Sequence, residues 1–192
     1  MLMTEHGALY VPPQGLILPD GRRLLLVPET EEYLPDGRPL IAGGVFASGL
    51  YVTNWIDVVD ATQLAVDLSL TTHKWAMYTN TLTPNFSTDV SYSVTNEVSG
   101  TGYTAGGRTI AAGGGSPTTT ESPAGTLMYD QNNMVWPAPT SVTARGAILY
   151  ADALAADNLI VASNFGSDFT STNGTFTIQW NALGVFTVDL VP

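Results

Sequence analysis

Apolar and polar residues alternate along much of the chain after residue 73, in short runs that turn residues separate. Alternation with a period of two predicts β-strands that bury one face and expose the other. We predict strands at residues 74–80, 109–112, 126–129, 142–150, 159–165, 174–180 and 184–191. The last two, joined by the sequence NALG, give the clearest hairpin signal in the chain.

One segment, residues 53–68, has helical spacing instead. A single stripe of this helix would contain Trp55, Val58, Val59, Thr62 and Val66. We expect Asn54 to cap its amino end and Asp57 to lie in its first turn. One helix among many short strands predicts a mainly β fold class, a β-sandwich-like domain with one helix.

Residues 1–44 differ in composition from the rest, because they hold six of the twelve prolines and three of the six basic residues. The motif Pro-Asp-Gly-Arg occurs in them twice, each time between apolar runs. Proline presets the backbone and glycine accepts a positive φ, so the motif predicts a turn. We predict a short β-hairpin from residues 16–18 and 23–27, followed by an extended segment that ends at Ile41.

The expected organisation is therefore an extended, hairpin-containing N-terminal arm at 1–44 and a β-sandwich-like domain at 45–192. Three consecutive leucines of the arm cannot all point into one small core, because side chains of a strand alternate between faces. We expect some of them to contact a neighbouring subunit; folding of the arm onto its own domain is an equal alternative. The candidate interface residues are Leu24, Leu25, Leu26, Tyr33, Leu34 and Trp136.

The segment 95–115, TNEVSGTGYTAGGRTIAAGGG, contains seven glycines and one arginine. A phosphate-binding loop or a dinucleotide fingerprint would lead from the glycines into a helix. No helical pattern follows here, because the sequence continues as RTIAAGGGSPTT. Turn formation explains the glycines better, with Tyr103 packed inside and Arg108 paired with Glu97 or an aspartate.

The formal charge is −11, from 17 acidic and 6 basic residues with one lysine, so binding to the phosphates of nucleic acid is not expected. Every apolar run is too short to span a membrane, and the start of the chain lacks the pattern of a secretion signal. We therefore expect no membrane partner and a protein assembled in the host cytoplasm. Charged residues make up only 12% of the chain, about half the usual share, which favours a surface that is covered by other subunits.

The residues that carry chemistry are few and scattered. Cysteine is absent, the two histidines have no acidic residue at ligand spacing, and no Gly-x-Ser-x-Gly motif occurs. We expect no catalytic, cofactor-binding or metal-binding residues. Arg145 lies among small and apolar residues, so we expect it to pair with Asp152, Asp168 or a neighbour's carboxylate. The prolines that follow Trp136 predict an edge or crossover segment.

Three stretches resemble a family of small virion proteins of tailed bacteriophages. They are residues 67–111, with the motif NEVSGTGYTAGG, residues 140–150, TSVTARGAILY, and residues 163–190, with the motif NGTFTIQWNALGVFTV. The resemblance covers most of residues 50–190 and none of the arm. It implies a structural part of the phage particle, on the head or the tail, and it brings no catalytic residues.

The first hypothesis is a capsid decoration or cement protein that binds the outer head surface of the virion. It would form a symmetric homo-oligomer, such as a trimer, and contact the major capsid protein or other virion proteins. The second hypothesis is a minor tail or tail-tip protein. The third is a carbohydrate-binding module of a host-recognition fibre, for which Trp136 beside Asn132 and Asn133 would supply the aromatic platform.

Overall fold

The computed structural model describes residues 16–17, 23–24 and 46–190 of the chain, which divides into two units, Met1–Ile41 and Ala42–Pro192. In the first unit β1 (Leu16–Ile17) pairs antiparallel with β2 (Arg23–Leu24), as the predicted hairpin requires. The other expectations for the arm fall outside the described residues. These include the positions of Leu25, Leu26, Tyr33 and Leu34 and the extended segment before Ile41.

The second unit contains two antiparallel sheets and one helix among its described residues, so the predicted fold class is confirmed. The larger sheet has the order β3-β9-β8-β4-β5, from strands Gly49–Leu50, Asn158–Ile178, Met134–Ala151, Lys74–Tyr78 and Arg108–Thr109. The smaller sheet has the order β10-β7-β6, from strands Phe186–Asp189, Thr126–Asp130 and Thr118–Glu121. The helix α1 is Val52–Val59.

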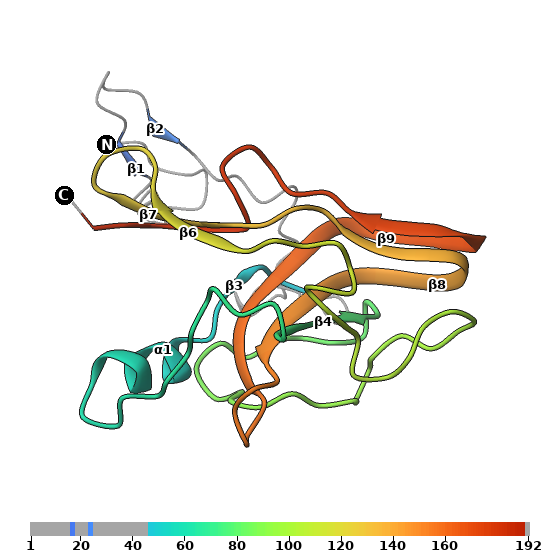
Figure 1. Cartoon of the computed structure of the whole chain (residues 1–192), viewed down its shortest axis with the longest axis horizontal. Helices are drawn as coiled ribbons and strands as arrows, with labels where there is room; N and C mark the ends of the chain where they lie inside the picture. Colours follow the sequence, from blue (N-terminus) through green and yellow to red (C-terminus); the bar gives the residue numbers. More distant parts are fainter. Residues whose placement is uncertain (1–15, 18–22, 25–45, 191–192) are drawn as a thin grey trace, which may run out of the picture. The chain divides into compact units, whose positions relative to one another are not determined.

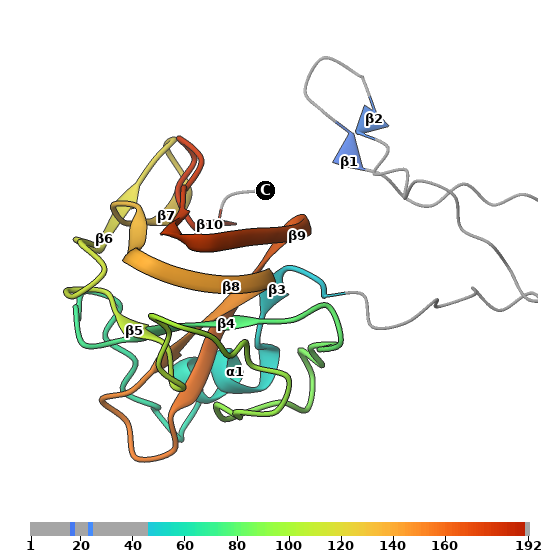
Figure 2. The same cartoon turned by 90° about the vertical axis from the view of Figure 1, so that its right-hand side faces the viewer.

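Strands β8 and β9 form one long hairpin that bends back over the sheet (Figures 1 and 2). The predicted strands 142–150 and 159–165 are parts of these two strands, and the predicted strand 174–180 lies in β9 up to Ile178, where β9 ends. The register shifts twice between Trp136 and Val142, where Pro137 and Pro139 cannot donate ladder hydrogen bonds. Trp136 pairs with Phe176 of β9. Among the described residues no strand pairs with β8 on its other side there, since β4 pairs with β8 only at residues 146–150, so the expected edge position is confirmed.

The predicted C-terminal hairpin is wrong. Strand β10 pairs with β7 in the smaller sheet, with Phe186 opposite Tyr129 and Val188 opposite Leu127. A bridge between Asn181 and Gly184 closes a tight turn, after which the chain passes to the second sheet. Alternation predicted the strand correctly, but it carries no information about which strand becomes the partner.

Helix α1 is shorter than predicted and ends at Val59. The C-cap residue Asp60 follows, and its side chain accepts a hydrogen bond from the backbone N–H of Thr62 (2.8 Å). The N-cap residue is Tyr51 and makes no side-chain cap, so the expected cap at Asn54 is wrong. Asn54 lies inside the helix and is buried. The side chain of Val59, expected on the inward stripe, is instead 81% exposed.

The core lies on both faces of the larger sheet. Residues Trp75 and Met77 of β4 enter a cluster that also contains Trp136 and Phe176 of the folded-back hairpin. The alternate residues Ala76 and Tyr78 enter a second cluster on the opposite face; its other buried members are Phe46, Tyr51, Ile148, Tyr150, Leu159 and Ala162. The predicted alternation in this strand is confirmed. The bent hairpin covers one face, and Leu82, Phe86 and Tyr92 pack against the cluster on the other face.

Candidate functional site

The glycine-rich segment is packed against the sheet and forms turns, as predicted. A Cβ at Gly107, whose φ is +73°, would overlap the carbonyl oxygen of Trp75 in β4. A Cβ at Gly100 would likewise overlap the carbonyl oxygen of Ser141 in β8. The glycines are therefore required where this loop touches backbone, which is a structural role.

The carboxylate of Glu97 holds this segment together. Its oxygens accept hydrogen bonds from the hydroxyls of Tyr92 and Tyr103 (2.5 Å each) and from the backbone N–H of Gly106 (2.9 Å). The packing of Tyr103 was predicted and is confirmed, since it stacks on Trp136 with 6.4 Å between ring centroids. The three donors converge on one carboxylate, so Glu97 is satisfied without a cation.

The basic residues pair only partly as expected. Arg145 Nε donates to Asp168 Oδ1 over 2.7 Å, which confirms one of the predicted partners. The predicted pairing of Arg108 with Glu97 or an aspartate is wrong, because its Nη2 donates to the carbonyl oxygen of Ala112 over 2.6 Å. Arg108 does not pair with Glu97, because the two carboxylate oxygens of Glu97 already accept hydrogen bonds from Tyr92 and Tyr103.

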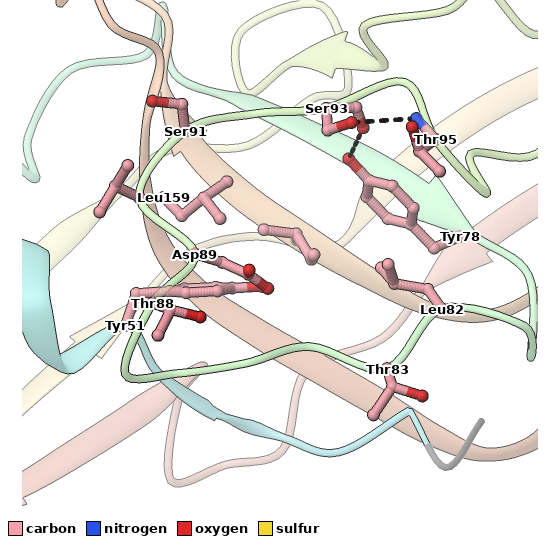
Figure 3. A pocket seen from close by; sticks show the side chains of 12 residues that line it. Tyr51, Tyr78, Leu82, Thr83, Thr88, Asp89, Ser91, Ser93, Thr95 and Leu159 are labelled. Carbon is pink, nitrogen blue, oxygen red and sulfur yellow. Dashed lines mark hydrogen bonds between the residues drawn. The ribbon is translucent and has the colours of Figure 1, made fainter.

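A cavity of about 450 Å³ lies between the loop of residues 82–95 and the sheet. Figure 3 shows Tyr51 beside Thr88 and Asp89 on one side and Leu82 and Thr83 on the other. The hydroxyl of Tyr51 is buried and has no hydrogen-bond partner among the described residues. Burial, and then the charge of Asp89, raise the pKa of this hydroxyl, so it stays protonated.

The lining of this cavity limits its chemistry. Its hydroxyl groups come from tyrosine, serine and threonine, and Asp89 is the one carboxylate among the lining residues. Asp89 Oδ2 already accepts a hydrogen bond from the backbone N–H of Asn85 over 2.8 Å. Tyr78 donates its hydroxyl hydrogen to Ser93 O over 2.8 Å (Figure 3). The site can hydrogen-bond a polar group, and it offers no second acid or base for proton transfer.

Helix α1 presents an apolar stripe outward. Val52, Ile56 and Val59 are 50, 53 and 81% exposed and lie at positions i, i+4 and i+7. The opposite side is anchored, because Asn54 Nδ2 donates to the carbonyl oxygens of Val90 (2.7 Å) and Leu159 (2.8 Å). This stripe was missed in the sequence, although its own i, i+4, i+7 spacing is visible beside the predicted one.

The predicted interface residues are not brought together in the described part of the chain. Trp136 is 2% exposed, and Tyr103 and Phe176 pack against its ring, so it is closed to a partner subunit or a sugar. The register of the hairpin shifts at the prolines that follow it, and the ring lies in the buried core cluster. Leu24 is placed in β2, but its side chain lies outside the described residues.

The buried histidine is held by backbone. His73 is 1% exposed, and its Nε2 donates to the carbonyl oxygen of Asp67 over 2.7 Å. Burial lowers the pKa of His73.

Among residues 46–190 and the two short described strands, no three His, Cys, Asp or Glu side chains are grouped to hold a metal ion. Nor does this described part contain a helix of the length and apolarity needed to cross a membrane.

Comparisons with known proteins give no further information: no family model, curated protein or solved structure matches the chain. The resemblance to tailed-phage virion proteins therefore depends on the sequence motifs alone.

Proposed function

We propose that this chain is a structural protein of a tailed-bacteriophage particle, and that it decorates and stabilises the outer surface of the head. The observation that carries the proposal is the outward apolar stripe of α1, formed by Val52, Ile56 and Val59. An exposed apolar stripe on an anchored helix is a surface suited to docking. Its partner would be an apolar groove on the major capsid protein or another virion subunit.

The energetics of the stripe favour stable attachment. Moving one Val or Ile from water into an interface contributes about 1.5–3 kcal/mol before the costs of association. The buried amide of Asn54 fixes the helix, so little ordering of the stripe is needed on binding. A ligand that binds only the assembled shell stabilises it by mass action, which is how a decoration protein would act.

The charge of the chain is consistent with an outer position. A net charge of −11 would repel packaged DNA, whereas the outer surface of a head imposes no such penalty. The low charged fraction also favours contacts with copies of the same chain, as in a symmetric homo-oligomer such as a trimer. The arm residues Leu24, Leu25, Leu26, Tyr33 and Leu34 remain proposed contacts to the same shell.

The test is a binding assay with phage heads that lack this protein. The double variant Ile56→Asp, Val59→Asp is expected to bind about a hundredfold more weakly, because two apolar contacts are replaced by charges. Leu183→Asp is the matched control, since Leu183 is also an exposed apolar residue but belongs to the turn between Asn181 and Gly184 and not to the helix. Unchanged binding of the double variant, or an equal loss in the control, would contradict the proposal.

A tail or tail-tip location is the second candidate, because the motif resemblance does not distinguish head from tail. Copy number separates the two. Decoration requires hundreds of copies per particle, whereas a tail component requires a few, and quantitative densitometry of purified virions measures this directly.

A further inference from the structure

A second cavity lies along strand β9, with a volume of about 660 Å³, within the range of ligand-binding clefts. It is lined by β9 and the two residues after it. The lining residues are Ser163, Asn164, Phe165, Phe169, Thr170, Ser171, Thr172, Thr175, Phe176, Thr177, Ile178, Gln179 and Trp180. None of these side chains is charged, in a chain with 17 acidic residues. We call this cavity the β9 groove.

The aromatic rings of the β9 groove are held in place from the core outward. Phe176 packs edge-on against the buried Trp136, and Phe165 lies 6.2 Å from Phe176. Phe169 contacts Phe165 at 6.3 Å and is itself 51% exposed. An exposed ring that is backed by a chain of packed rings is a preorganised apolar platform.

Polar groups of the β9 groove remain available for a ligand. Thr170 and Ser171 already make hydrogen bonds within the hairpin, to Thr143 Oγ1 (2.8 Å) and Thr140 O (2.9 Å). In contrast, the side chains of Thr172, Thr175, Thr177 and Gln179 have no hydrogen bond to another described residue. The groove therefore combines an aromatic platform with several uncharged donors and acceptors.

Trp180 closes one end of the β9 groove. Its indole N–H donates to the carbonyl oxygen of Asn132 over 3.2 Å, and its ring lies 4.7 Å from that of Trp75. The indole nitrogen is thus occupied, so only the apolar surface of this side chain is left for a ligand. Because Trp180 is partly exposed, its fluorescence can report on a bound ligand.

We propose that the β9 groove binds a neutral oligosaccharide. A pyranose ring has an apolar C–H face, which packs on an aromatic ring, and a rim of hydroxyls, which pair with amides and hydroxyls. Phe169 and Trp180 supply the rings, and Gln179 with the threonines of β9 supplies the hydrogen bonds. The lack of charge in the lining selects against uronic acids and sialic acids, which need a cationic partner.

An added polypeptide strand fits this groove less well, although among the described strands only β8 pairs with β9 along residues 163–178. Strand addition needs a regular edge over several residues. Gly166 has a φ of +81° and Asn164 Oδ1 accepts the N–H of Gly166, so the edge is turned there. The register of β9 against β8 also shifts four times. Bends of this kind protect a sheet edge from pairing.

The site is separate from the proposed docking stripe on α1, and none of the three stripe residues lines the groove. The variants of the two sites therefore act as controls for each other. Loss of sugar binding in Phe169→Ala with normal attachment to heads would support the sugar site and leave the proposed attachment to heads unchanged.

The experiment titrates the full-length protein with neutral oligosaccharides of glucose, galactose, mannose and N-acetylglucosamine, and with oligogalacturonate as the charged comparison. Tryptophan fluorescence and calorimetry measure affinity for the wild type, Phe169→Ala, Gln179→Ala and the control Leu183→Ala. At least one neutral oligosaccharide should bind, with an affinity that Phe169→Ala weakens roughly tenfold or more. Leu183→Ala should leave it unchanged, and Gln179→Ala should weaken it without altering the fold.

The proposal is overturned if none of the four neutral oligosaccharides binds or if oligogalacturonate binds best. It is also overturned if Phe169→Ala leaves the affinity unchanged. A further contrary outcome is that Phe169→Ala instead dissociates an oligomer in light scattering, which would assign the groove to a second copy of the chain. Circular dichroism of each variant separates a lost site from a lost fold.

Discussion

The hydroxyl of Tyr103 donates a hydrogen bond to Glu97 Oε1 over 2.5 Å, and it accepts one from the backbone N–H of Met77 over 2.9 Å. This contact ties the glycine-rich segment to strand β4. Burial, and then the hydrogen bond to Glu97, raise the pKa of the Tyr103 hydroxyl, so it remains a donor at physiological pH. The loop that resembles a ligand cradle in sequence is therefore closed by its own side chains.

Glu97→Gln is expected to destabilise the domain by about 1.5–3 kcal/mol, because hydrogen bonds to a charged acceptor are replaced and one tyrosine loses its acceptor. Chemical denaturation measures the change in the free energy of unfolding. Glu121→Gln is the matched control, since its carboxylate also accepts a backbone N–H, that of Gly125 over 2.7 Å, but is exposed. The control should change stability by less than about 0.5 kcal/mol. Equal effects would contradict the role of Glu97.

Gly107→Ala is expected to cost more than about 2 kcal/mol, because a Cβ there would overlap Trp75 O in addition to straining a positive φ. Gly114 provides the comparison, with a φ of +85° and open space around its Cβ position. Gly114→Ala should cost only the strain of the left-handed backbone, about 1–2 kcal/mol. Thermal unfolding of both variants gives the difference. A Gly107→Ala variant as stable as Gly114→Ala would show that the loop is loosely packed.

His73 predicts a pH dependence of stability. Burial lowers the pKa of His73 in the folded state, whereas in the unfolded chain it is about 6.5. The unfolded state therefore binds more protons in this range. This contribution to stability is fully present above the unfolded pKa and is lost as the pH falls below it. The Tm of the wild type should thus drop more steeply from pH 7 to pH 5 than that of His73→Gln. Parallel pH profiles would refute the assignment.

Deletion of residues 1–40 tests the proposed role of the arm. The truncated protein should keep the near-ultraviolet circular dichroism of the second unit, because the packed core clusters lie within residues 46–190. It should lose attachment to phage heads, since the arm would supply part of the contact. Quantification of bound protein per head is the measurement. Full occupancy by the truncated protein would remove the arm from the proposal.

Two strands show what the alternation of apolar and polar residues can and cannot predict. In β4 the alternation of Trp75 and Met77 with Ala76 and Tyr78 predicted both the strand and its two faces correctly. In β6 (Thr118–Glu121) all four residues are exposed, so the sequence carries no alternation to find. A strand that is held by pairing rather than by burial is invisible to a hydrophobic pattern.

The candidate sites depended on tertiary structure more strongly than the strands did. Asn54 fits an N-cap by sequence, but the neighbouring carbonyls of Val90 and Leu159 draw its amide into the core. Trp136 fits an exposed platform, but its ring lies in the buried core cluster. The sequence neighbours of these two residues indicate an N-cap and an exposed ring, whereas contacts with distant parts of the chain decide their roles.

The sequence by itself determined the mainly β class, the presence of a helix near residue 55, the turns of the glycine-rich segment and the need of Arg145 for an acidic partner, although not which of the candidate partners it would be. These follow from side-chain periodicity, backbone preference and the cost of an unpaired charge, which are local quantities. Only the tertiary structure decided that β10 joins β7, that the β8–β9 hairpin folds over the sheet, and that Phe169 stands at a groove. Any strand offers the same backbone hydrogen bonds, so the choice among partners depends on long-range packing.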